Sequence, residues 1–157
     1  MTSDDLIKDT LQTSKIIAIV GASVPKENES VSKIRLKPSI IVMKYLLEFG
    51  YKVIPVNPFS VGKKVNGETI VEKLEDISSQ IDIVNVFRPS KETPDIAKKA
   101  IKVGAKTLWL QFGIQNNEAE EISKSAGLTC IMNKCIKQEY QRLFLKMKPV
   151  FPVLLND

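Results

Sequence analysis

The chain of 157 residues contains no histidine and only two cysteines, Cys130 and Cys135. Zinc sites are built largely from cysteine and histidine, so an ordinary zinc site is not expected, and two cysteines are too few for a disulfide scaffold. Histidine is also the commonest general base and can carry a phosphoryl group. Its absence therefore excludes every enzyme whose chemistry depends on histidine.

Long apolar runs are missing as well. No segment approaches the roughly 20 apolar residues that a membrane-spanning helix needs. Residues 1–5 are polar and acidic, whereas a secretory signal is basic and then apolar. A chain of this length fits one domain with a sizeable core. We therefore expect a single cytoplasmic domain over residues 1–157, with its core at 15–143, that does not contact a membrane.

The formal net charge is +5, and most of the lysines are scattered over predicted helix faces. One basic cluster stands out, formed by Lys26, Lys33, Arg35 and Lys37. No aromatic residues are interleaved with it, as binding of single-stranded nucleic acid would favour. The positive charge could reflect nucleic acid, a small anionic ligand or no specific partner. Because aromatic residues are missing from the cluster, we do not expect a nucleic-acid partner.

Five short apolar runs rich in β-branched residues alternate with helical patterns, and they predict strands at 16–20, 52–56, 83–87, 107–110 and 128–132. Each run is apolar on both faces, which is typical of buried parallel strands. No Asn-Gly or Asp-Gly pair joins consecutive predicted strands, so no β-hairpin is expected, and Asn66-Gly67 is placed in a loop before a short helix. The pattern predicts an α/β, Rossmann-like doubly wound sheet of about five parallel strands flanked by helices.

Helices are predicted at 3–13, 38–49, 92–103, 116–126 and 136–147, three of them closed by glycines suited to a left-handed cap. Residues 24–37 form a long irregular loop between the first strand and the first crossover helix, where a nucleotide-binding loop belongs. Pro149 and Pro152 make the last residues a non-helical tail. Packing of this tail on the domain or on a neighbouring subunit is open, so a homo-oligomer remains possible.

In an open parallel sheet, ligands bind in the crevice at the C-terminal ends of the strands. The candidate site is therefore read from the residues that follow each strand: Gly21-Ala22-Ser23, Asn57-Pro58, Arg88, Gln111-Phe112-Gly113 and Asn133-Lys134-Cys135. In the first of these, glycine permits a sharp turn and close approach to a ligand. The N–H groups of the turn and the Ser23 hydroxyl can hydrogen-bond a phosphate beside a helix start, and the alternative is a plain strand-to-helix turn.

Two cationic positions extend this anion site. Lys37-Pro38-Ser39 places a cation and a hydroxyl at a predicted helix start, with an ordinary helix cap as the alternative. Arg88 follows the third strand and suits a phosphate, with a structural ion pair as the alternative. Gln111 and Asn133 are suited to an adenine or an amide, unless loop hydrogen bonds use them.

The cysteines differ in their expected roles. Cys130 is expected in the core, whereas Cys135 lies near a helix start that can lower the pKa of a thiol. A buried spectator thiol is the alternative for Cys135. If its thiol is reactive, the chain could be an enzyme acting on a nucleotide or an acyl-CoA.

Two common nucleotide-binding motifs are absent. The dinucleotide fingerprint lacks its second and third glycines, and the second strand is followed by Asn57-Pro58 rather than by a carboxylate for a ribose. No Gly-Lys-Ser/Thr motif follows the first turn, so the P-loop of nucleoside triphosphatases is absent. NAD is consequently disfavoured, although an NAD(P)- or nucleotide-binding redox sensor remains an alternative.

Several motifs together resemble the CoA-binding domain family, which includes the first domain of the succinyl-CoA synthetase α subunit. They are, in order, residues 19–23, 37–39, 50–58, 82–88, 108–113 and 135–137. The resemblance implies a Rossmann-like protein that binds coenzyme A across the strand ends. It implies that Gly21-Ala22-Ser23 and Lys37-Pro38-Ser39 face phosphates, that Asn57-Pro58 shapes the floor, and that Arg88 and Gln111 line the crevice.

Departures from the family pattern include a longer first loop and Tyr140 where a histidine is common. The related ligases use a phosphohistidine, which this chain cannot form. We therefore expect binding of CoA or an acyl-CoA without catalysis by this chain alone, with association with an acyl-CoA enzyme as a further possibility. The expected CoA-binding residues are Gly21, Ala22, Ser23, Lys37, Pro38, Ser39, Asn57, Pro58, Arg88, Gln111, Gly113 and Cys135.

Overall fold

The computed structural model describes residues 2–25 and 37–147. Within this part of the chain, five strands form a parallel sheet in the order β2-β1-β5-β6-β7. The strands are β1 (Ile16–Val20), β2 (Lys52–Val56), β5 (Ile83–Val86), β6 (Thr107–Leu110) and β7 (Thr129–Ile131). The predicted α/β, Rossmann-like fold is confirmed. Strands β5 and β7 are slightly shorter than the predicted 83–87 and 128–132.

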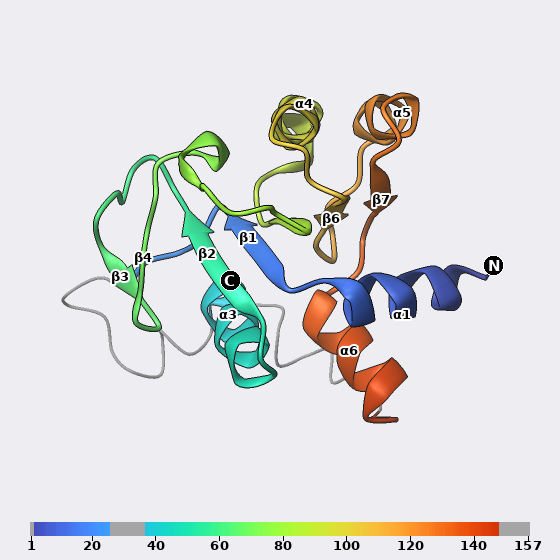
Figure 1. Cartoon of the computed structure of the whole chain (residues 1–157), viewed down its shortest axis with the longest axis horizontal. Coiled ribbons are helices and arrows are strands. Elements are labelled where there is room, and N and C mark those ends of the chain that lie inside the picture. The colour runs from blue at the N-terminus through green and yellow to red at the C-terminus, as the bar shows by residue number, and fades with distance from the viewer. Residues whose placement is uncertain (1, 26–36, 148–157) are drawn as a thin grey trace.

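Helices cover both faces of the sheet (Figure 1). On one face lie α1 (Ser3–Thr13), α3 (Pro38–Glu48) and α6 (Ile136–Phe144), and on the other lie α4 (Thr93–Lys102) and α5 (Asn117–Ser125). Two 3₁₀ turns, η1 (Leu74–Asp76) and η2 (Ser90–Glu92), precede β5 and α4. Helices α3, α4 and α5 end one residue earlier than predicted, because the residue before each closing glycine serves as the cap. Helix α6 ends three residues before the predicted 147.

Alternation of side chains along the strands produces two hydrophobic cores. On β1, Ile17 and Ile19 pack with α1, α3 and α6, whereas Ala18 packs with α4 and α5. Strand β5 repeats the arrangement, with Ile83 in the first core and Val84 in the second. All of these side chains are fully buried, so the central strands are apolar on both faces as their sequences predict.

The prediction that the chain has no β-hairpin was wrong. Strands β3 (Lys64–Val65) and β4 (Glu68–Thr69) pair antiparallel across Asn66-Gly67. Both turn residues have positive φ angles, 49° at Asn66 and 81° at Gly67, as a two-residue type I′ turn requires. The Nδ2 of Asn66 also donates to the carbonyl of Ile40, 3.1 Å away, which fastens the hairpin to α3. Strands of two residues are too short to show an alternating pattern.

Tyr51 connects the start of β2 to helix α1. Its ring is buried in the first core, and its hydroxyl donates to the carbonyl oxygen of Leu11 near the end of α1. Burial raises the pKa of Tyr51 from 10.0 to about 12, with a smaller contribution from the neighbouring Tyr140. The buried hydroxyl therefore adds a hydrogen bond to the apolar packing of α1 and makes that contact sensitive to high pH.

Tyr51→Phe should lower the free energy of unfolding by about 1 kcal/mol near neutral pH, because the hydrogen bond to Leu11 is lost. The pKa of Tyr51 is higher in the folded state, so its contribution is complete below pH 10 and is lost as the pH rises through about 12. In urea unfolding, the stability difference between the wild type and Tyr51→Phe should shrink across this window. A difference that stays constant would contradict the assignment.

Candidate functional site

The site lies where the direction of the chain connections reverses. From β1 the chain passes through α3 to β2, and from β5 it passes through α4 to β6, so the neighbouring strands β1 and β5 send their helices to opposite faces (Figure 1). Open α/β sheets bind ligands at such a switch point, beyond the C-terminal ends of the strands. At this point the structure has a cavity of about 410 Å³.

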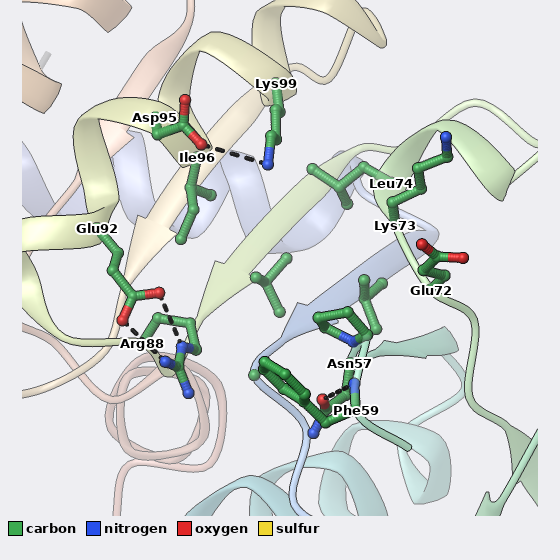
Figure 2. A pocket seen from close by; sticks show the side chains of 14 residues that line it. Asn57, Phe59, Glu72, Lys73, Leu74, Arg88, Glu92, Asp95, Ile96 and Lys99 are labelled. Atoms are coloured by element: carbon green, nitrogen blue, oxygen red, sulfur yellow. Dashed lines mark hydrogen bonds and ion pairs between the residues drawn. The ribbon is translucent and has the colours of Figure 1, made fainter. Parts of the chain in front are cut away.

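Four of the residues that the sequence predicted line this cavity: Gly21, Asn57, Pro58 and Arg88 (Figure 2). They come from the ends of β1, β2 and β5. The remaining wall was not predicted as part of a site, and it consists of Val20, Val56, Phe59, Glu72, Lys73, Leu74, Glu92, Asp95, Ile96 and Lys99. Val20 and Val56 end β1 and β2, and the other residues come from the loop after β2, the segment that enters η1, and the start of α4.

Position 21 requires glycine because the side chain of Arg88 packs directly against it. Its φ angle is +87°, and a Cβ at this position would lie only 2.7 Å from Cδ of Arg88 and 3.0 Å from its Cγ. The aliphatic stem of Arg88 therefore crosses directly over the glycine. A side chain at position 21 would displace the arginine in addition to straining the turn.

The turn after β1 uses its own N–H groups within the protein. Those of Gly21 and Ala22 donate to the carbonyl of Val56 at 3.0 and 3.3 Å, and that of Ser23 donates to Oγ of Ser39 at 2.9 Å. Ser39 is buried in the first turn of α3, so this bond fastens the turn to the helix. These N–H groups were expected to face a phosphate, but all three donate to acceptors within the protein.

Asn57 connects two of the loops around the cavity. Its Nδ2 donates to the carbonyl of Ala22, and its Oδ1 accepts from the N–H of Phe59, both at 2.9 Å. The second bond holds Asn57-Pro58-Phe59 in a tight turn that presents Phe59 to solvent with 88% of its surface exposed. In Figure 2 the ring of Phe59 extends from this loop toward the side of the cavity where Arg88 lies.

The charges around the cavity are largely paired. Arg88 forms a two-pronged ion pair with Glu92, with Nε–Oε1 and Nη2–Oε2 distances of 3.1 and 2.8 Å. One turn farther along α4, Lys99 lies 3.2 Å from Asp95. The structural ion pair considered for Arg88 is therefore present. Together with Glu72 and Lys73, the cavity wall carries three basic and three acidic side chains.

The predicted residues at the ends of β6 and β7 make hydrogen bonds of their own, which are buried around Gln111 and solvent-exposed between Gly113 and Asn133. Gln111 is only 5% exposed, and its Oε1 accepts from Nδ2 of Asn85 at 3.2 Å and from the N–H of Ile136 at 3.0 Å. The N–H of Gly113 donates to Oδ1 of Asn133 at 2.7 Å. Cys135 caps the start of α6 and is 7% exposed. These residues do not belong to the lining of the cavity at β1 and β5.

The remaining predicted residues gather at the start of α3. Pro38 occupies its first turn, and Lys37 precedes it with its Nζ 3.3 Å from the carbonyl of Val24. The rest of the expected basic cluster, Lys26, Lys33 and Arg35, lies outside the described residues. Cys130, expected in the core, is only half-buried because β7 is an edge strand, and burial raises the pKa of its thiol.

Within residues 2–25 and 37–147, the structure has neither a membrane-spanning helix nor a cluster of metal ligands. None of their helices has the length and apolar character needed to cross a bilayer. No cluster of three or more carboxylate, cysteine or histidine side chains among them is placed to hold a metal ion.

Residues 15–141 match the family model of the CoA binding domain. The chain belongs to the CoA-binding domain family. It is 39% identical over 131 residues to the uncharacterized protein YneT of Bacillus subtilis (strain 168), a match that covers 83% of this chain and 89% of YneT. The resemblance inferred from the strand-end motifs is thereby confirmed.

Solved structures share the fold of this chain. A Thermus thermophilus protein superposes with a TM-score of 0.80 at 34% identity, covering 91% of this chain and all of that one. A dinucleotide-forming acetyl-coenzyme A synthetase from Candidatus Korarchaeum cryptofilum gives a TM-score of 0.60 at 22% identity, covering 81% of this chain but 27% of the synthetase. The likeness to the synthetase shows a shared fold.

The contact between Gly21 and Arg88 can be tested against a matched glycine. Gly21→Ala and Gly113→Ala both place alanine at a φ near +88°, which costs about 1 kcal/mol of stability. At Gly113 no atom lies within 4 Å of the added Cβ, whereas at Gly21 the stem of Arg88 must move. Urea unfolding should therefore show a loss about 1 kcal/mol larger for Gly21→Ala. A backbone carbon of Phe87 also lies 3.3 Å from the added Cβ at Gly21, so part of the excess should remain in an Arg88→Ala background. Equal losses, or an excess that is undiminished in that background, would count against the contact.

Proposed function

We propose that this protein binds coenzyme A or an acyl-CoA at the C-terminal edge of its sheet, with part of the ligand in the cavity between β1, β2 and β5. Membership of the CoA-binding domain family supports the ligand class. The observation that carries the location is Arg88, whose stem lies across Gly21 at the switch point of the sheet. The volume of about 410 Å³ falls within the usual range of small-molecule sites.

The side chains around this edge fit the parts of CoA. The diphosphate and the 3′-phosphate need cations, since the N–H groups of the turn are already used. Arg88 provides a planar group of donors suited to phosphate, and Lys37 adds a second cation at the start of α3, where the helix dipole also favours an anion. The exposed ring of Phe59 provides a flat apolar surface for the adenine base.

The alternatives have less support from the geometry. A redox sensor that binds NAD(P) needs a group after β2 to hold a ribose, and both ends of the Asn57 amide are engaged within the protein. An enzyme that uses Cys135 needs an accessible thiol, and Cys135 is buried at the start of α6. We therefore propose a binding role for this chain.

Isothermal titration of the purified protein with CoA should show one-site binding, and Arg88→Ala should weaken it by about tenfold to a hundredfold, as expected for loss of a charge-assisted hydrogen bond. Lys37→Ala should weaken it less. Lys98→Ala is the matched control, because Lys98 is exposed on α4 but does not line the cavity. The proposal fails if millimolar CoA produces no binding heat, or if NADH binds more tightly than CoA.

Comparison of CoA with dephospho-CoA assigns the cations to individual phosphates. A loss of affinity in Arg88→Ala for CoA but not for dephospho-CoA would locate the guanidinium at the 3′-phosphate. An equal loss for both ligands would locate it at the diphosphate. The same comparison applies to Lys37→Ala.

Phe59 can be tested with fragments of the ligand. Phe59→Ala should weaken binding of adenosine 3′,5′-diphosphate by about tenfold, within the range that base–aromatic stacking supports, and should leave 4′-phosphopantetheine unaffected. Val61→Ala is the control, because Val61 is exposed in the same loop and does not line the cavity.

A fluorescent variant gives an independent reading of the same contact. Trp109 is the only tryptophan of the chain and is fully buried. Phe59→Trp therefore adds a second, solvent-exposed indole whose emission should be quenched when a base stacks on it. If CoA binds to Phe59→Trp without changing this emission, the base lies elsewhere.

A further inference from the structure

Arg88 is the cation that a ligand phosphate would use, and it is already paired with Glu92. Two parallel hydrogen bonds of 3.1 and 2.8 Å join the guanidinium to the carboxylate. This arrangement is the one in which arginine also binds phosphates. A phosphate that approaches the end of β5 therefore meets a guanidinium whose Nε–Nη2 edge is already used by a carboxylate.

Arg88 is held so that only its charged end is free to exchange partners. Its Cγ and Cδ lie against Gly21, within 3.0 Å of where a Cβ would stand. The packing fixes the stem between the ends of β1 and β5, and the guanidinium extends beyond it. Exchange of the bound anion then requires rotation of the terminal torsions alone, without movement of the backbone.

Glu92 is placed where it can release the arginine at modest cost. It is the residue at which η2 ends and α4 begins, so its carboxylate lies at the positive end of a ten-residue helix. Its side chain is 37% exposed, which allows water to solvate the carboxylate once the pair is broken. A half-exposed pair of this kind adds little to folding stability.

We propose that Glu92 is an internal competitor for Arg88, so that a phosphate binds at this site by displacing a carboxylate from the same guanidinium. This inference rests on the proposed function and adds a residue that sets its affinity and selectivity. A ligand with only one weakly charged group gains little from the exchange, because that group merely takes the place of the Glu92 carboxylate. A ligand with several phosphates gains further contacts, so Glu92 selects against small anions.

The test compares two acidic residues that each lie at the start of a helix. Glu92→Gln removes the competing charge and should increase the affinity for CoA and for inorganic pyrophosphate by about tenfold. Glu118→Gln is the matched control: Glu118 is exposed in the first turn of α5, does not line the cavity, and its substitution changes the net charge by the same amount. It should change either affinity by less than about twofold.

A double-mutant cycle separates exchange at Arg88 from a general change of charge. In an Arg88→Ala background, Glu92→Gln should give no gain in affinity. Glu92→Asp retains the charge but shortens the side chain, so it should give an intermediate gain and provides a second variant should the amide perturb the start of α4. Thermal unfolding of each variant verifies that the fold is retained.

The outcomes separate this inference from the proposed function. If wild type binds CoA but Glu92→Gln binds it no more tightly, or more weakly, Glu92 is not a competitor and the CoA site stands. The same conclusion follows if Glu118→Gln gives an equal gain or if the gain persists without Arg88. If neither wild type nor Glu92→Gln binds CoA or pyrophosphate, both proposals fail.

Discussion

The parallel pairing of β1 with β5 brings Gly21 and Arg88 together, and the candidate site depends on that contact. The register places Val20 opposite Val86, so the turn after β1 and the two residues after β5 leave the sheet side by side. Without a Cβ on Gly21, the arginine stem can cross the turn at this point. The same turn bends toward β2 and donates two N–H groups to Val56. One glycine thus connects the ends of three strands.

Much of the fold could be predicted because its signals are local and strong. The central strands β1, β5 and β6 are short apolar runs that are buried on both faces, and this requires two cores on opposite sides of one sheet. The hairpin at Asn66-Gly67 was not predicted, because its strands have only two residues each. They depend on packing of Val65 and Ile70 and on the hydrogen bond from Asn66 to α3. Such contacts are not visible as a pattern along the chain.

The site was predicted only in part, for a related reason. The strand-end rule locates Gly21, Asn57 and Arg88 correctly at the cavity, because the C-terminal ends of neighbouring parallel strands meet at one edge. The rule does not show whether an amide side chain at a strand end is free to bind a ligand or is used within the protein. Gln111 satisfies Asn85 and the N–H of Ile136, which lie 26 and 25 residues away in the chain. Glu92 was not predicted as a residue of the site either, since its pairing with Arg88 depends on where α4 begins.

A binding edge whose polar groups are engaged internally is ordered before any ligand arrives. Asn57 uses both ends of its amide to join the turn after β1 to the loop after β2, and this holds Phe59 in place at the rim. Little conformational entropy is then lost in that loop on binding, which favours affinity. The balanced charges of the wall have the opposite effect, because Glu92 already occupies the Nε–Nη2 edge of Arg88. Under the proposed function, preorganisation of the loops and competition at the arginine would together favour ligands that carry both a flat base and several phosphates over ligands that carry only one of these.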